Sequence, residues 1–163
     1  MLEQQALIEL LSINEQNIDN ATARKIIASY AAIFNELSAV CQLVLEFSIE
    51  GATLNESKFM VDMEAFSLDL LSLNDEFEEN QLTNTKAQLQ TFIKCFNQLD
   101  QAQRTIIYYS FFKNESASSI VQILFNAKQT YSVRTFYRKK NEASVLLVKK
   151  IKWYKIKQNS KQL

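Results

Sequence analysis

The sequence predicts an all-α fold, and its composition gives two reasons. The 163 residues include one glycine, Gly51, and no proline, so the turn residues on which β-proteins depend are scarce. Leu, Ile, Ala, Lys, Glu and Gln, most of which favour helices, are plentiful. Apolar residues make up 47% of the chain, which is enough to bury a core. We therefore expect a globular helical protein with room for one ordinary domain or two small ones.

The spacing of apolar residues is the third reason, and it places the helices of the first half. Residues 2–13 form the first expected helix. Asp19 or Asn20 can cap the second, because either side chain can accept an unpaired amide of the first turn. That helix is expected from Ala21 to about Ile49. Its apolar face consists of Ile26, Ile27, Tyr30, Ile33, Phe34, Leu37, Val40, Cys41, Val44 and Leu45.

The middle of the chain is less regular. Gly51 marks the clearest break, and residues 58–80 favour helix over strand. Residues 80–88, NQLTNTKAQ, read as a connector, so we place an internal boundary near residue 82. The expected organisation is an acidic helical region over residues 1–82, for interaction or dimerisation, and a basic DNA-binding domain over residues 83–163.

Four helical segments are expected after the boundary. The first covers residues 86–99, and the second covers residues 101–113 with Asp100 as a possible N-cap. A shorter third helix can be capped by Ser116 or Ser118. The fourth begins at Ser132 and is long. Its inward stripe consists of Phe136, Ala143, Leu147, Ile151 and Tyr154.

Several functional classes are disfavoured by composition. Histidine is absent, which excludes His-dependent triads and His-ligated zinc. Two distant cysteines, Cys41 and Cys95, fit small buried hydrophobes better than a disulfide or a metal cluster. We therefore expect no enzyme, no cofactor and no metal site. The chain starts with acidic and amide residues, without a signal-peptide pattern or a bilayer-spanning apolar run, so we expect a cytoplasmic location and no membrane partner.

Charge is divided unequally along the chain. Residues 1–100 contain 5 Lys or Arg and 16 Asp or Glu, whereas residues 101–163 contain 13 Lys or Arg and 2 acids. A split of this size favours a polyanion as partner of the basic half. The alternative is that the two halves simply attract each other.

The segment YSVRTFYRKK, residues 131–140, carries the functional prediction. A short helix, a connection and a helix with a basic, polar start occur in the order that a helix-turn-helix requires. Ser132 can cap the second helix, and Phe136 points inward, so its neighbours can reach a major groove. The predicted DNA-binding residues are Ser132, Val133, Arg134, Thr135, Tyr137, Arg138, Lys139 and Asn141. The alternative is a surface helix with scattered cations.

A second basic run follows on the same helix. Lys149, Lys150, Lys152, Lys155 and Lys157 surround Trp153 and Tyr154 and can reach phosphates. Equally, Val145, Leu146, Val148 and Trp153 lie off the inward stripe and can form the seam of a homodimer. The sequence alone does not choose between these readings.

The segments LDQAQRTIIYYSFF, SSIVQILF and YSVRTFYRKKNEA together resemble the C-terminal half of the ArpU family of phage-type late transcriptional regulators, which are related to the RinA activators. The arrangement is also similar to the DNA-binding fourth region of bacterial sigma factors, and NIDNATARKIIASYAAIFNEL resembles the opening of ArpU-family proteins. The resemblance implies a sigma-like helix-turn-helix bundle. It places Ser132, Arg134, Thr135, Tyr137 and Arg138 at motif positions of a DNA-reading helix, with Phe136 packed beneath.

Two functional hypotheses follow. The first is a sequence-specific, DNA-binding transcriptional regulator, whose activation of late packaging or lysis genes is implied by the resemblance alone. The second is an adaptor that binds RNA polymerase or another regulator without reading DNA, which the acidic half suits. An enzyme ranks third, because the acids Asp75, Glu76, Glu78 and Glu79 better fit a solvated turn.

Overall fold

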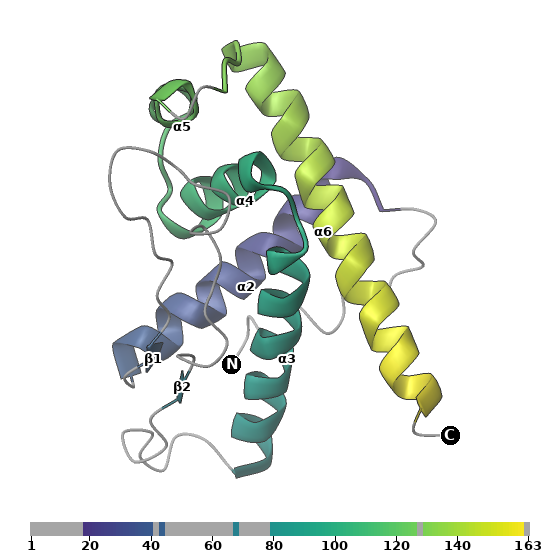
Figure 1. The fold of residues 1–163 in the computed structure, drawn as a ribbon. Coiled ribbons are helices and arrows are strands. Elements are labelled where there is room, and N and C mark those ends of the chain that lie inside the picture. Colours follow the sequence, from purple (N-terminus) through teal and green to yellow (C-terminus); the bar gives the residue numbers. More distant parts are fainter. Residues whose placement is uncertain (1–17, 41–42, 45–66, 69–78, 127–128, 162–163) are drawn as a thin grey trace.

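The computed structural model describes residues 18–40, 43–44, 67–68, 79–126 and 129–161, and it confirms the all-α prediction. The first expected helix, residues 2–13, lies outside these ranges. The long C-terminal helix forms one flank of the molecule, and the other helices lie beside it (Figure 1). In chain order the elements are α2 (Asn20–Val40), β1 (Leu43–Val44), β2 (Ser67–Leu68), α3 (Glu79–Asn97), α4 (Gln101–Ile107), η3 (Tyr108–Phe112), α5 (Ala117–Asn126) and α6 (Val133–Lys161).

Helix α2 begins as expected but ends early. Asp19 is its N-cap, since its carboxylate accepts a 2.7 Å hydrogen bond from the backbone N–H of Thr22. This bond lowers the pKa of Asp19. The predicted end at Ile49 is wrong, because the helix stops at Val40 and Val44 lies in β1, opposite Ser67 of β2. Pairing with a distant segment satisfies the backbone there, and the periodicity of one segment cannot reveal such pairing.

The middle of the chain departs from the prediction at two further places. Helix was favoured over residues 58–80, but Ser67 and Leu68 form strand β2, which pairs antiparallel with β1. Residues 80–88 were expected to be a connector, but they belong to α3. Asn and Thr are weak helix formers, yet Leu89 on this helix is fully buried, and burial of one face outweighs weak propensity.

Helix α4 is fixed by a capping box. The Asp100 carboxylate accepts from the backbone N–H of Gln103, and the Gln103 side chain accepts from the backbone N–H of Asp100. The predicted cap and start of this helix are therefore confirmed. The chain then widens into the π-helix η3, and Asn114 follows with φ of +51°, a left-handed conformation that Asn tolerates well.

Arg104 of α4 links this helix to the end of α3. Its guanidinium Nη1 donates to the backbone carbonyls of Asn97, at 3.3 Å, and of Leu99. Only 6% of Arg104 is exposed, so the bonds are made in the interior. Carbonyls at a helix end lack intrahelical hydrogen-bond donors, and here the Arg104 guanidinium provides the donors. The angle between α3 and α4 is thereby held by one buried cation.

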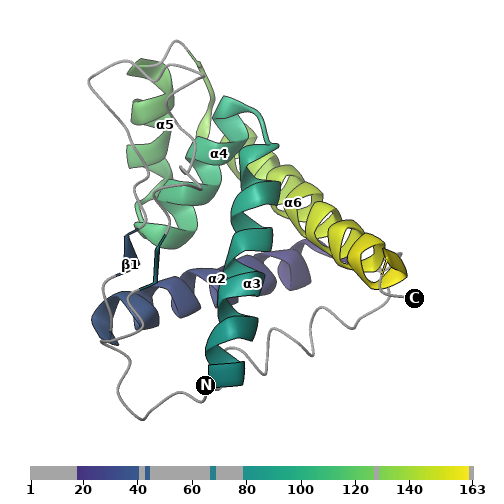
Figure 2. The same ribbon diagram turned by 60° about the horizontal axis from the view of Figure 1, so that its bottom comes forward.

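One large hydrophobic core joins helices from both halves of the chain. Figures 1 and 2 show α2, α3 and α6 lying against one another. Tyr30 and Phe34 of α2 contact Phe92 of α3 at ring-centroid distances of 4.8 and 5.8 Å, and Phe34 also contacts Phe112 of η3 at 5.5 Å. Cys95 is buried in this core as a free thiol, as expected. The other cysteine, Cys41, is not among the described residues.

This core bears on the predicted boundary near residue 82, which falls in the first turn of α3. Buried residues of α2 share the core with buried residues of α3 and α6, so among the described residues the boundary does not separate two cores. Apolar faces on both sides of residue 82 cover each other. The core residues are Ala23, Ile26, Ile27, Tyr30, Ile33, Phe34, Leu37, Leu89, Phe92, Ile93, Cys95, Phe96, Leu99, Ile107, Tyr108, Ala143, Leu147, Val148 and Ile151.

Candidate nucleic-acid interface

The candidate interface is built on a second, smaller core where α4, α5 and the start of α6 meet. Ile106 of α4, Ile120 and Leu124 of α5, and Phe136 of α6 form this core, and each is at most 1% exposed. Ser116 caps α5, since its hydroxyl accepts from the backbone N–H of Ser119 at 3.2 Å. The predicted short helix, connection and long helix are thus present. Figure 1 shows α5 and the first turns of α6 at the same end of the molecule.

Ser132 is the N-cap of α6, as the sequence predicted. Its Oγ accepts a 3.1 Å hydrogen bond from the backbone N–H of Thr135 and donates a 2.9 Å bond to the Thr135 hydroxyl. The cap leaves the other first-turn N–H groups at an exposed helix end. Such an end attracts a phosphate, because its unpaired amides and the helix dipole both favour an anion.

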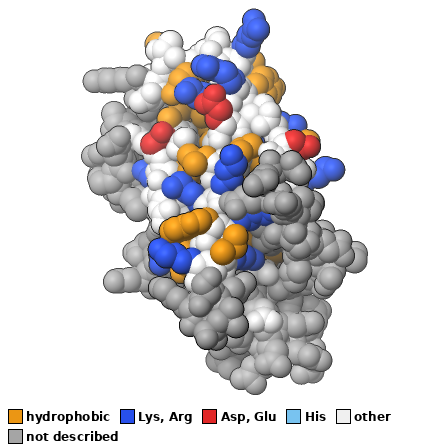
Figure 3. Space-filling view, turned by 90° about the vertical axis from the view of Figure 1, so that its right-hand side faces the viewer, with side chains coloured by type: hydrophobic (Ala, Val, Ile, Leu, Met, Phe, Trp, Pro, Cys, Tyr) orange, Lys and Arg blue, Asp and Glu red, His pale blue; other side chains and the backbone are white. Residues whose placement is uncertain are grey.

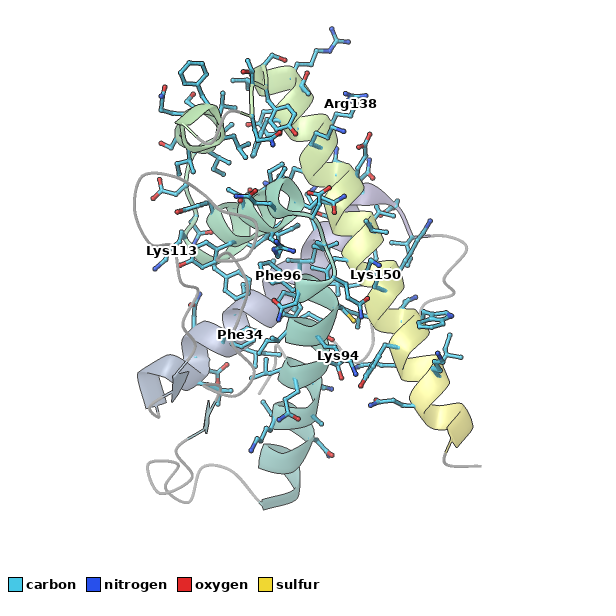
Figure 4. The ribbon with its side chains drawn as sticks, in the orientation of Figure 1. Phe34, Lys94, Phe96, Lys113, Arg138 and Lys150 are labelled. Atoms are coloured by element: carbon cyan, nitrogen blue, oxygen red, sulfur yellow. The ribbon has the colours of Figure 1, made fainter. Side chains whose placement is uncertain are left out.

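Phe136 sets the rotation of α6 about its own axis. Its ring is 1% exposed and contacts the ring of Tyr137 edge-on at 5.4 Å, while Tyr137 is 52% exposed. Arg134 and Arg138 are exposed, and Arg138 extends from the outer side of α6 in Figure 4. Residues 134, 137, 138 and 141 share one helical face by their spacing of three, one and three. The structure therefore presents two guanidinium groups and a phenol hydroxyl together on one side.

The remaining predicted residues have more mixed positions. Val133 is 44% exposed in the first turn, whereas Thr135 is half-buried and bonded to Ser132. Lys139 forms a salt bridge with Glu142 at 3.7 Å. Asn141 is half-buried and accepts a hydrogen bond from Arg24 of α2. Asn141 thus already has a protein partner at the rear of the exposed face.

Sequence reasoning missed Arg24, which the fold brings to this interface across more than a hundred residues. Its bond to Asn141 joins the start of α2 to the third turn of α6. Lys140 lies close by, with its ammonium 5.1 Å from the centroid of the Phe111 ring. Burial, together with the charge of Arg24, lowers the pKa of Lys140. No local pattern marks Arg24, because only the packing of α2 on α6 places it there.

A shallow hollow lies beside Arg138, where the start of α2 approaches α6. Its volume is about 440 Å³, and Arg138, Glu142 and Lys149 are among the charged residues around it. Figure 3 shows the flank of the molecule that carries α6, with Lys and Arg side chains among exposed hydrophobic ones and fewer acids. Cations therefore continue along α6 beyond its first turns.

The second basic run does not form one uniform surface. Lys149 and Lys157 are exposed, but Lys152 is only 5% exposed, and burial lowers the pKa of Lys155. The predicted homodimer seam also loses one of its four residues, because Val148 is fully buried in the large core. Val148 cannot belong to a dimer surface without unpacking that core, although Leu146 and Trp153 are 37% and 57% exposed.

The part of the chain that the structure describes contains no group of three or more Cys, Asp or Glu side chains placed to hold a metal ion. Nor is any described helix both long and apolar enough to cross a bilayer. Comparisons of the sequence and structure with protein-family models, curated proteins and solved structures gave no match.

Proposed function

We propose that this chain is a sequence-specific DNA-binding transcriptional regulator that places the first turns of α6 in a major groove. One observation carries the proposal. Phe136 is fixed in the core of α4, α5 and α6, which leaves Arg134, Tyr137 and Arg138 together on an exposed face behind the Ser132 cap. Arginine can donate two hydrogen bonds to guanine or pair with phosphate, and tyrosine can reach either through its hydroxyl.

The ArpU resemblance supports a more particular role. It suggests a regulator of phage or phage-derived late genes, active in the cytoplasm as an activator of packaging or lysis functions. In this role the protein binds double-stranded DNA as a non-enzymatic factor and can act as a homodimer. Two α6 helices would then read half-sites about one helical turn apart, since the symmetry of a dimer is mirrored in its operator.

The test is binding to promoter fragments from a phage-type late operon by fluorescence anisotropy. Changing Arg134 and Arg138 to alanine should weaken binding to the preferred duplex at least about tenfold, because each well-placed arginine contact contributes about 1–3 kcal/mol. If both guanidinium groups contact phosphate, the salt dependence should also flatten by about two units of slope.

A matched control removes the same charge elsewhere. Lys86 and Lys113 are exposed and belong to neither α2 nor α6, so Lys86→Ala with Lys113→Ala should change the affinity less than the arginine pair does. Equal affinity of wild type and the arginine variant for the selected duplex would show that α6 does not read DNA.

The adaptor remains the second proposal, and the acidic composition of residues 1–100 favours it. An acidic surface is repelled by a duplex and suits a protein partner such as RNA polymerase. Pull-down from a nuclease-treated host lysate separates the cases. Retention of polymerase by a protein without measurable duplex affinity would support the adaptor over the DNA-reading regulator.

A further inference from the structure

A groove between α3 and α6 lies farther along α6 than the proposed DNA-reading turns, and Lys149 borders both this groove and the hollow beside Arg138. It consists of two adjoining hollows of about 330 and 380 Å³, which share Gln98, Trp153 and Tyr154 as lining residues. In Figures 1 and 2, α6 diverges from α3 toward its C-terminal end. Figure 4 shows Lys94 extending from α3 toward α6 and Lys150 on the facing side of α6. We call this the α3–α6 groove.

The groove combines cations with aromatic rings. Its described lining includes four lysines, Lys94, Lys149, Lys150 and Lys157. No Asp or Glu is among the described lining residues. The Lys157 ammonium lies 4.4 Å from the centroid of the Trp153 ring, and that of Lys94 lies 4.9 Å from the centroid of Tyr154. These contacts hold two of the charges beside apolar surface. The groove is therefore complementary to a ligand that is both anionic and apolar.

The duplex bound by the start of α6 does not account for this groove. Residues 137 and 153 are sixteen positions apart, which corresponds to about 24 Å along a helix. A recognition helix enters the major groove with its N-terminal end, so its C-terminal turns lie farther from the DNA. The lysines near Trp153 therefore call for a different anionic partner.

The geometry favours several separated carboxylates over one phosphate group. Lys149 and Lys157 are eight residues apart on α6, or about 12 Å along its axis, so anionic groups spaced along a chain match the four lysines better than one compact anion does. Carboxylates spaced along a peptide can each meet one lysine.

We propose that the α3–α6 groove binds an acidic peptide segment of a partner protein that also carries large apolar side chains. Its carboxylates pair with the four groove lysines, and an apolar side chain packs on Trp153 and the edge of Tyr154. Trp153 is 57% exposed, and tryptophan is among the residues that dominate binding energy at protein interfaces. The exposed amides of Gln98 and Gln158 can bond to the peptide backbone.

The test uses a fluorescein-labelled peptide of about 12 residues, long enough as a helix to span the groove, in which Asp and Glu alternate with Leu and Phe. Binding to the full chain is followed by anisotropy. Trp153 is the single tryptophan of the chain, so a change in its fluorescence reports binding at the groove. A second peptide with Ser in place of every acid should bind far more weakly. Added salt should weaken the binding of the acidic peptide, because it screens the charges.

Two variants locate the site. Lys94→Gln with Lys157→Gln should weaken peptide binding about fivefold, as expected for the loss of two exposed ion pairs. Trp153→Ala should weaken it about 30-fold, as expected for an interface anchor. Lys25→Gln with Lys113→Gln removes the same charge elsewhere and should have little effect. Changing Arg134 and Arg138 to alanine should leave peptide binding intact. The peptide assay therefore tests the groove independently of whether α6 binds DNA.

Two results would overturn the proposal. One is an unchanged peptide affinity in both the lysine pair and the Trp153 variant, provided that circular dichroism shows them folded. The other is tighter competition by ATP or by a single-stranded oligonucleotide than by the unlabelled peptide, which would assign the groove to nucleotides or nucleic acid instead.

Discussion

At the residue scale, Cys95 shows how the core sets the chemistry of a single group. Cys95 is 1% exposed in the large core, and burial raises the pKa of its thiol to about 11, although the nearby Lys150 and Lys94 act in the opposite direction. Burial also raises the pKa of the Tyr30 hydroxyl. Both groups are therefore held in their neutral forms by the folded state.

This burial predicts that stability falls in alkaline solution. The thiol has a pKa of about 9 in the unfolded chain, so it loses its proton there more easily than in the folded protein. Its contribution to stability is therefore fully present below pH 9 and is lost as the pH rises toward 11. Between pH 8 and pH 10.5, Cys95 should account for a loss of about 2 kcal/mol in the free energy of unfolding.

Urea unfolding at several pH values measures this loss. In a Cys95→Ala variant, the decline between pH 8 and pH 10.5 should be smaller, because only groups such as Tyr30 then contribute. The same alkaline decline in wild type and variant would show that the thiol is not shielded as the structure indicates.

The residue scale is also where sequence reasoning was most accurate. The caps at Asp100 and Ser132 were predicted, and those at Asp19 and Ser116 were each one of two predicted candidates, since a cap depends on groups within three residues of each other. The inward position of Phe136 followed equally from helical spacing. The bond between Arg24 and Asn141 was not predictable, because it joins residues that only tertiary packing brings together.

At the scale of elements, errors arose where tertiary contacts overrule local pattern. Strand β1 ended the predicted long helix, because Leu43 and Val44 pair with residues more than twenty positions away. Helix α3 extends through polar residues that resemble a connector, because its other face is buried. In contrast, α4 and α5 begin where their caps are, since each cap bonds to a residue three positions farther along the chain. Local rules thus predicted the helix starts that have a side-chain cap better than the start of α3 or the end of α2.

The small core shared by α4, α5 and α6 predicts a specific effect of changing Phe136 to alanine. The ring fills the small core between Ile106 and Leu124, so its removal should destabilise the protein by about 3–4 kcal/mol. Because the large core lies elsewhere, the loss should appear first as faster hydrogen exchange in α5.

Tyr137→Ala is the matched control, since this neighbouring ring is 52% exposed. It should change stability by less than about 1 kcal/mol while weakening DNA binding. Equal protection of α5 in the Phe136 variant and in wild type would contradict the view that this residue holds the helices together.

At the scale of the whole molecule, the large core joins regions that the sequence assigned to different parts. Ile26, Ile27, Tyr30, Ile33, Phe34 and Leu37 of α2 are all buried in it. A fully buried large apolar side chain contributes about 1.5–3 kcal/mol, so these six contribute about 10 kcal/mol or more. The net stability of a domain is about 5–15 kcal/mol, which is of the same size.

We therefore expect that residues 79–163 do not fold cooperatively alone, although they contain every predicted DNA-binding residue. Without α2, the apolar faces of Phe92, Phe96 and Leu147 would be exposed to water, and the bond from Arg24 to Asn141 would be missing. The fragment should keep helical circular dichroism, bind a hydrophobic dye and unfold over a broad urea range. A synthetic peptide of residues 18–40, added in excess, should restore a sharper transition, because it returns the missing face of the core.

A fragment that unfolds as sharply as the full chain without the peptide would instead establish an independent C-terminal domain. In that case the contacts of α2 would be an addition to the DNA-binding unit and not a condition for its folding.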